Sequence, residues 1–285
     1  MNEGTLSVPG ARICYKVRGA GPVLLAIQGG GGTADATDGI ADVLESEFTI
    51  VSYDRRGLLR SPLTDRKQPL TIERHADDAL ALLDAVGAAQ AFVFGSSLGA
   101  LIGLALVLRA PGRVTLLVAH EPPTPELLSD ERRAEFDGVR RSALEIALRE
   151  GPRAAFRHVL AAMGIDRDDR ESEIEPPASC RAQSRDTGFL LSQEVRAIDA
   201  YRLDFAALER AASRIVPAYG ASSHAFYPAE CARALAHKVG RRPVEFPGGH
   251  NGYVLRPRAF AETLRAALDG ESSRGSRAEG VVLPA

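Results

Sequence analysis

The strongest chemical signal in the sequence is a serine held between two glycines. The run from Gly95 to Gly99 reads GSSLG and stands between an apolar run, residues 91–94, and a second apolar segment that is rich in glycine and alanine. Glycines on both sides of a sharp strand-to-helix turn let neighbouring backbone approach and leave the serine Oγ exposed. The helix that follows offers its positive dipole end and the Leu98 N–H to a developing oxyanion. The pattern predicts that Ser97 is a nucleophile and that Leu98 is an oxyanion-hole donor.

A glycine-rich loop follows another apolar run. Gln28 precedes four consecutive glycines, residues 29–32. Glycine is costly to order, so such a loop indicates close approach of backbone to another group. We predict that Gly30 donates the second N–H of the oxyanion hole. A flexible linker and a phosphate-binding loop are the alternatives, but the loop lacks the ending of a P-loop and the glycine spacing of a dinucleotide-binding fingerprint.

A histidine near the C-terminus is the predicted base. His250 follows Gly248 and Gly249, directly after the last expected strand. A histidine on a loop at the carboxyl end of a strand can reach a serine presented at the same edge of a sheet. We expect surface or structural roles for His75, His158, His224 and His237, and we expect His120 to be a neighbour of the site or part of the pocket wall rather than a base.

Short apolar runs alternate with longer segments of helical period, and this alternation predicts a mostly parallel sheet covered by helices. Residues 71–86 form an expected amphipathic helix with Thr71 as N-cap and Gly87 as its stop. The first two strands should form an antiparallel edge. The expected strands are residues 5–8, 12–17, 23–27, 49–53, 91–95, 115–119, 215–219 and 244–246.

The alternation breaks between about Pro122 and Ala212, where helical stretches occur without a convincing strand. We predict a helical cap at residues 122–212, inserted after the sixth strand into a core domain of residues 1–121 and 213–270. Apolar residues of this cap could hold an apolar substrate; they are Phe156, Met163, Phe189, Leu190 and Leu191. Residues 271–285 are polar and offer little to bury, so we expect a disordered tail.

Composition narrows the classes of function. With 285 residues, 45% of them hydrophobic, and a net charge of −2, the chain can bury a large core and lacks the basic field that nucleic acid requires. Three scattered cysteines, Cys14, Cys180 and Cys231, predict neither a disulfide framework nor a metal site. We expect no metal, no organic cofactor and no membrane span, a small-molecule substrate, and a cytoplasmic location.

Taken together, the elbow at Ser97, the run from Tyr53 to Gly57 after the fourth strand and the loop at His250 resemble the α/β-hydrolase superfamily. The resemblance covers roughly residues 5–268 and implies an eight-stranded α/β-hydrolase fold with a helical cap after strand 6. The superfamily often carries the acid of its catalytic triad in a Gly-x-x-Asp loop after the seventh strand. Here that loop begins at Gly220 and has no carboxylate.

Glu121, at the end of the sixth strand, is the expected replacement for this acid, because haloalkane dehalogenase-like members carry theirs on the same strand. A structural Glu121 in a salt bridge is one alternative. A rewired pair that uses a cap residue such as Asp199 or Asp204 is the other. Gln28 stands where these enzymes usually have histidine, which leaves the backbone donors of the loop available.

The predicted function is a serine hydrolase, esterase-like or lactonase-like, that cleaves an ester, lactone or thioester of a small, largely apolar molecule through an acyl-enzyme on Ser97. One alternative keeps the pocket but changes the reaction to carbon-carbon bond hydrolysis or a non-hydrolytic biosynthetic step. Another is a small-molecule binding protein on this fold, against which the intact set of Ser97, Glu121 and His250 argues.

Overall fold

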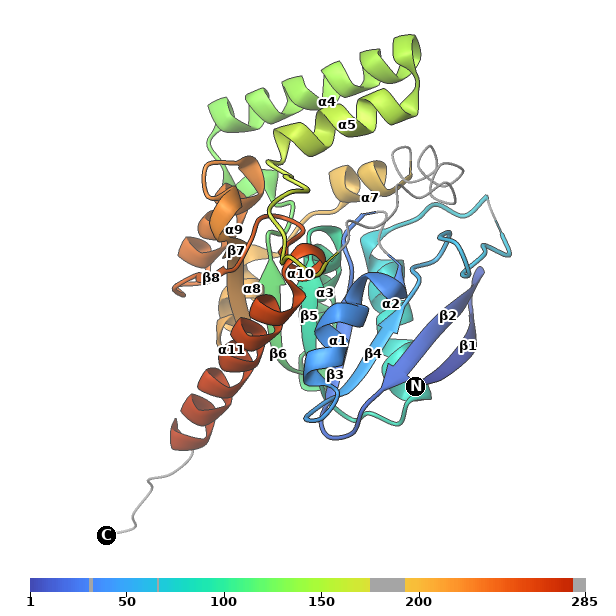
Figure 1. Cartoon of the computed structure of the whole chain (residues 1–285), viewed down its shortest axis with the longest axis vertical. Coiled ribbons are helices and arrows are strands. Elements are labelled where there is room, and N and C mark those ends of the chain that lie inside the picture. The colour runs from blue at the N-terminus through green and yellow to red at the C-terminus, as the bar shows by residue number, and fades with distance from the viewer. Residues whose placement is uncertain (31–32, 66, 175–192, 279–285) are drawn as a thin grey trace.

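The chain folds around one sheet that has helices on both faces (Figure 1). This computed structural model describes residues 1–30, 33–65, 67–174 and 193–278, without the side chains of Pro152, Phe156 and residues 271–278. The strands are β1 (Asn2–Val8), β2 (Ala11–Arg18), β3 (Val23–Ile27), β4 (Thr49–Tyr53), β5 (Ala91–Ser96), β6 (Val114–His120), β7 (Ile215–Gly220) and β8 (Val244–Phe246). The helices are α1 (Asp38–Leu44), α2 (Ile72–Ala85), α3 (Leu98–Arg109), α4 (Asp130–Glu150), α5 (Pro152–Ala162), α7 (Val195–Ala200), α8 (Phe205–Arg210), α9 (Tyr227–Lys238), α10 (Gly252–Leu255) and α11 (Pro257–Ala278).

The sheet has the order β1-β2-β4-β3-β5-β6-β7-β8. β1 pairs with β2 and β2 with β4 in antiparallel register, while all pairs from β4 to β8 are parallel. The predicted strands and the antiparallel edge are therefore confirmed. Because parallel strands run in one direction, the loops that leave β3, β5, β6, β7 and β8 meet at the same edge of the sheet.

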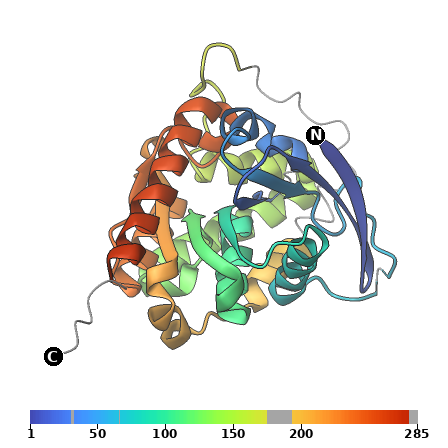
Figure 2. The ribbon, with the colours of Figure 1, turned by 90° about the horizontal axis from the view of Figure 1, so that it is seen from below.

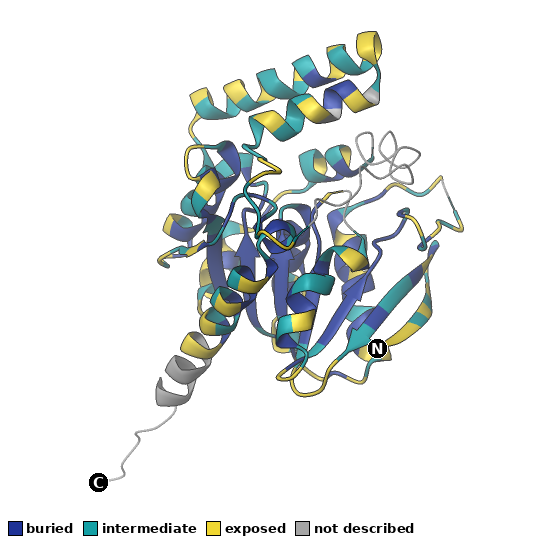
Figure 3. Cartoon of the chain, viewed as in Figure 1, coloured by how far each residue is buried: buried dark blue, intermediate teal, exposed yellow. Residues whose placement is uncertain are grey.

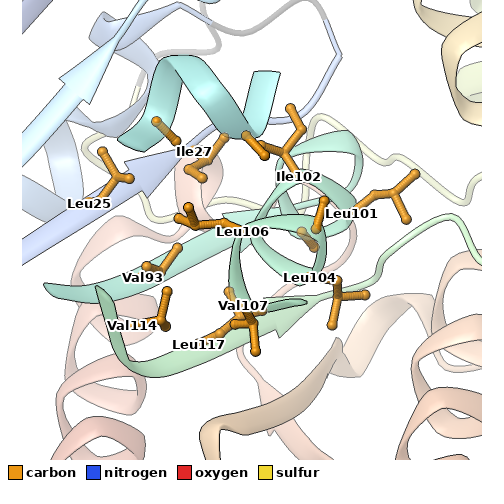
Figure 4. Close-up of a cluster of buried hydrophobic side chains, with 14 of the residues drawn as sticks. Leu25, Ile27, Val93, Leu101, Ile102, Leu104, Leu106, Val107, Val114 and Leu117 are labelled. Carbon is orange, nitrogen blue, oxygen red and sulfur yellow. The ribbon is translucent and has the colours of Figure 1, made fainter. Parts of the chain in front are cut away.

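Helices cover the two faces unequally. α1 and α11 lie on one face, and α2 and α3 lie on the other (Figure 2). The central strands are buried on both sides, whereas α4 and α5 expose much of their surface (Figure 3). Ten of the twelve residues of α3 are buried, and Figure 4 shows Leu106 and Val107 packed among side chains of the strands beneath. A helix that is apolar nearly all round is expected at this central position.

Local signals place the ends of α2 as expected. The Thr71 side chain accepts a hydrogen bond from the Arg74 N–H, which caps the first turn. Gly87, with φ of +71°, follows the last turn, a conformation in which glycine has no steric penalty.

Between β6 and β7, the described residues form helices and no strand. α4 and α5 lie side by side at one end of the molecule, and α7 lies nearer the sheet (Figure 1). α8 belongs to the main body, because Leu208 is buried in the same core as α3. Cys180, Phe189, Leu190 and Leu191 lie outside the described residues.

The expected tail starts too early. α11 continues to Ala278, so residues 271–278, predicted to be disordered, are helical, and residues 279–285 lie outside the described part. Extending an existing helix adds a hydrogen bond for each residue fixed, and no proline interrupts the segment. A polar sequence therefore did not by itself end the helix at Gly270.

Candidate active site

Ser97 lies at the junction of β5 and α3, as predicted. Its backbone has φ of +54° and ψ of −122°, an uncommon conformation for a residue with a side chain. The Ser97 N–H donates to the His120 carbonyl at 2.8 Å, and its own carbonyl accepts from the Ala100 N–H at 2.9 Å. The side chain is half-buried. The strained turn thus fixes Ser97 between β6 and the start of α3.

The two glycines of the motif are required by packing. A Cβ at Gly99 would lie 2.0 Å from the Ile27 carbonyl oxygen, and a Cβ at Gly95 would lie 2.5 Å from the Gly99 carbonyl oxygen. Both distances are far below van der Waals contact. The helix can therefore approach β3 this closely only with glycine at these positions.

The glycine loop after β3 lies against the serine turn. A Cβ at Gly29 would be 3.2 Å from the Ser97 Cβ and 3.9 Å from its Oγ. Gly30 is exposed, and Gly31 and Gly32 lie outside the described residues. Leu98 is the first residue of α3, where a helix leaves the backbone N–H without an intrahelical partner. The predicted donors therefore flank the serine from two elements.

Glu121 and His250 are in direct contact. His250 Nδ1 lies 2.5 Å from Glu121 Oε2, and both side chains are buried. Glu121 follows β6 with φ of +51°, and its N–H donates to the Ala218 carbonyl at 2.9 Å. Ser97 Oγ and His250 form no hydrogen bond among the described residues. Two of the three predicted catalytic residues are thus paired, and Ser97 is hydrogen-bonded through its N–H to His120, the residue that precedes Glu121.

The alternative acids are engaged elsewhere. Asp199 pairs with Arg140 of α4. Asp204 caps α8 by accepting the Ala207 N–H at 2.9 Å. Of the carboxylates weighed from the sequence, Glu121 is the one that contacts His250 in the structure.

Ser223 is a site residue that the sequence analysis missed. Its Oγ donates to Glu121 Oε1, and the Gly220 N–H donates to the same oxygen at 2.9 Å. Ser223 is fully buried. It occupies the fourth position of the Gly-x-x-Asp pattern that begins at Gly220, the last residue of β7, and this position was the available signal. The loop without a carboxylate therefore supplies two donors to a carboxylate on the neighbouring strand.

These contacts set the charge state of Glu121. Burial alone would raise the pKa of its carboxyl group, but the hydrogen bond from His250, the charges of His120 and His250 and the bond from Ser223 lower it to about 2. Glu121 is therefore ionised at neutral pH. An ionised carboxylate on Nδ1 fixes the tautomer that leaves Nε2 of His250 free to accept a proton.

His120 is a buried neighbour of this pair. Burial lowers its pKa to about 4, and neither ring nitrogen has a hydrogen-bond partner in the described structure. The ring packs against Phe246 and Phe260. This environment suits a neutral structural side chain rather than a base.

Comparison with known proteins identifies the family. A family model for the alpha/beta hydrolase fold matches residues 22–159. The chain is 35% identical over 275 residues to the "Uncharacterized hydrolase YraK" of Bacillus subtilis (strain 168), and the match covers 95% of this chain and 97% of that protein. The chain belongs to the α/β-hydrolase family.

Solved structures share this α/β-hydrolase fold. ALR0039 from Nostoc sp PCC 7120 matches with a TM-score of 0.73 and 19% identity, over 94% of this chain and 97% of that one. The enol-lactonase from Burkholderia xenovorans LB400 matches with a TM-score of 0.63 and 21% identity, over 93% and 100% of the two chains.

Other features of this α/β hydrolase concern possible metal sites, membrane-spanning helices and cavities. Within the described residues, no group of three or more histidine, cysteine, aspartate or glutamate side chains is arranged to hold a metal ion. None of the described helices has the length and apolar character needed to cross a membrane. An open cavity of about 460 Å³ lies between the end of α5 and the loop after β7, lined by residues such as Gly164, Asp169 and Ser222. Neither Ser97 nor His250 is among the residues that line it.

Proposed function

We propose that the protein is a serine hydrolase that cleaves an ester, lactone or thioester of a small molecule through an acyl-enzyme on Ser97. The observation that carries this proposal is the buried contact of 2.5 Å between Glu121 and His250, next to a strained serine turn. An ionised acid that orients a histidine beside an activated serine is the arrangement that acyl transfer requires.

In the proposed acylation step, His250 Nε2 removes the proton from Ser97 Oγ as the oxygen attacks the substrate carbonyl. Glu121 stabilises the imidazolium that forms and remains ionised throughout, in keeping with a pKa lowered to about 2. His250 then gives the proton to the leaving alcohol or thiol, and the acyl group stays on Ser97.

The N–H groups of Leu98 and Gly30 are the proposed donors to the tetrahedral oxyanion. They belong to two elements, the first turn of α3 and the loop after β3, which packing at Gly29 holds against Ser97. In deacylation, His250 activates a water molecule, which attacks the acyl-enzyme and releases the acid.

The proposed substrate class has support of two kinds. The residues at the edge of the sheet supply a nucleophile, a base and backbone donors, which suit an activated carbonyl. The solved enol-lactonase that shares the fold acts, by its name, on a lactone. The apolar preference of the substrate is inferred from the sequence between β6 and β7, where Met163 is half-buried.

Turnover of p-nitrophenyl esters tests this proposal. Wild type should hydrolyse a series with acyl chains of two to eight carbons. For esters whose acyl-enzyme is hydrolysed more slowly than it forms, a burst of about one nitrophenolate per protein should precede the steady state. Ser97→Ala should lower kcat by about 10⁴-fold or more, since the nucleophile is lost.

Ser96→Ala is the matched control. Ser96 is adjacent, buried, and its Oγ has no hydrogen-bond partner in the described structure, so its loss should change kcat less than about threefold. Ester hydrolysis by folded Ser97→Ala at the wild-type rate would show that another group attacks the carbonyl.

A further inference from the structure

Arg55 joins the glycine loop to a residue far away in the sequence. Its side chain is fully buried, and one terminal nitrogen, Nη1, donates to the carbonyls of Gln28 at 2.6 Å and Gly29 at 2.7 Å. The other terminal nitrogen, Nη2, donates to Glu194 Oε1 at 2.8 Å. The guanidinium is therefore held by two backbone carbonyls and one carboxylate.

This contact sets the direction of the Gly30 N–H. The described chain contains no cis peptide bond, and in a trans peptide the C=O and the following N–H point to opposite sides. Because Arg55 holds the Gly29 carbonyl, the Gly30 N–H is directed away from Arg55. The charged donor also polarises that peptide, which strengthens its N–H as a hydrogen-bond donor.

The preceding N–H already has a partner. Burial raises the pKa of Tyr253, and a backbone hydrogen bond from Gly29 together with the charge of Arg55 partly offsets that rise. Since the Gly29 N–H serves the Tyr253 hydroxyl, Gly30 is, of the two described glycines in this loop, the one whose N–H is left for an oxyanion.

Glu194 adds a charge beside the same loop. It immediately precedes α7, lies 139 residues from Arg55 and is buried. A Cβ at Gly30 would be 3.8 Å from Glu194 Oε2. An unpaired carboxylate beside this loop would repel a developing oxyanion, so we expect the pairing with Arg55 to be needed for the loop to act as a donor.

We propose that Arg55 is a positioning residue for the oxyanion hole and that Glu194 acts through it, so that the segment leading into α7 is coupled to the Gly29–Gly30 peptide. This inference rests on the proposed function. It adds a buried link between the region that follows β6 and the donor that stabilises the transition state.

Two neighbouring arginines provide a matched test. Arg55→Lys keeps the charge but lacks the planar fork that reaches two carbonyls and a carboxylate, so kcat for p-nitrophenyl butyrate should fall roughly 10- to 100-fold with KM changed less than about threefold. Arg56→Lys is the control, because Arg56 is equally buried but donates to Asp78 and the Pro9 carbonyl instead of the loop. It should lower the unfolding temperature and leave kcat within about threefold of wild type.

Phenylboronic acid separates positioning from general damage, since it adds to the serine and places an oxygen in the oxyanion hole. Its inhibition constant should weaken in Arg55→Lys by about the same factor as kcat/KM, while inhibition by the product butyrate should not change. Glu194→Gln removes the carboxylate that holds Nη2 of Arg55. Boronate inhibition should therefore weaken about three- to tenfold, even though a negative charge beside the loop is also removed. The double variant should be no worse than Arg55→Lys alone, because Glu194 acts through Arg55.

The inference would be overturned if folded Arg55→Lys kept the kcat and the boronate inhibition constant of wild type. It would also be overturned if the losses of boronate inhibition in the two single variants multiplied in the double variant. If Arg55→Lys does not fold, Glu194→Gln carries the test, and unchanged boronate inhibition in that variant overturns the inference. A wild-type protein that neither hydrolyses the ester nor binds the boronate would refute the proposed function instead.

Discussion

At the scale of single residues, the proposed acid Glu121 directly follows β6 and is held by the loop after β7. Glu121 occupies a left-handed conformation, φ +51°, which costs roughly 1–3 kcal/mol for a residue with a side chain. Its Oε1 accepts from Ser223 and Gly220, and its Oε2 faces His250. Two donors on one oxygen fix the carboxylate so that the other oxygen is aimed at the imidazole.

Ser223→Ala should therefore loosen Glu121 without touching substrate. We expect kcat to fall about tenfold with little change in KM, because a hydrogen bond to a charged group contributes about 1.5–3 kcal/mol. Ser223→Thr retains the hydroxyl and should restore most of the rate. Equal losses in both variants would indicate a packing defect rather than a lost hydrogen bond.

Ser223→Ala should also be less stable than wild type in acid. The pKa of Glu121 is lowered from 4.5 to about 2, so its contribution to stability is complete above about pH 4.5 and is lost as pH falls toward 2. Removal of the Ser223 hydroxyl raises that pKa, and the acid-unfolding midpoint measured by circular dichroism should move to higher pH.

At the scale of elements, the position of Ser97 depends on how closely α3 approaches β3. Gly99→Ala would place a Cβ 2.0 Å from the Ile27 carbonyl oxygen, so the helix or the strand must shift. We expect a loss of about 1–3 kcal/mol of stability and a lower kcat, because Ile27 leads directly into the oxyanion loop.

Gly138→Ala is the matched control for this substitution. Gly138 also lies in a helix, α4, but a Cβ there would meet no atom within 4 Å. Alanine should stabilise this helix by about 0.5–1 kcal/mol and leave kcat unchanged. Thermal unfolding and kcat are measured for both variants. A Gly99→Ala protein with the stability and the kcat of wild type would contradict the packing argument.

The sequence predicted the elements well because each strand is a local pattern. Buried parallel strands such as Val23–Ile27 read as continuous apolar runs, and the structure has all eight expected strands. The turn at Ser97 was equally readable, since its glycines mark the close approach directly. The end of a helix in polar sequence carries no such mark, so the extension of α11 past Gly270 could not be read from the sequence.

Contacts between distant side chains were less predictable. The Glu121–His250 pairing was predicted from the position of Glu121 at the end of the sixth strand and from the resemblance to haloalkane dehalogenase-like members, but Ser223 and Glu194 were not identified. Arg55 and Glu194 are 139 residues apart, and no local periodicity links them. Such pairs follow from the sheet order and the path between β6 and β7, which the sequence gives only coarsely.

At the scale of the whole molecule, buried neutral histidines make folding depend on pH. The pKa of His120 is lowered by burial from 6.5 to about 4, and burial also lowers that of His75 well below its ordinary value. The unfolded chain therefore binds protons that the folded protein does not. The contribution of His120 to stability is complete above about pH 6.5 and is lost as pH falls toward 4.

His120→Leu should reduce this dependence. A pKa lowered from 6.5 to about 4 corresponds to about 3 kcal/mol between those pH values. Leucine fits an apolar site that offers the ring nitrogens no partner, so the variant should lose less stability on acidification, with a remaining slope from His75. Urea unfolding at pH 7, 6, 5 and 4 measures how the free energy of unfolding depends on pH in wild type and variant. The same dependence in both proteins would exclude His120 as a source of it.

The central claim is that the edge of this sheet activates Ser97 as a nucleophile, and it is tested most directly by the intact mass of the protein after treatment with a fluorophosphonate probe. We predict one label per wild-type chain, none on Ser97→Ala, and slower labelling of Glu121→Gln because its acid no longer carries the charge that stabilises the imidazolium. Folded wild-type protein that takes up no label, or Ser97→Ala protein that labels at the wild-type rate, would contradict the account.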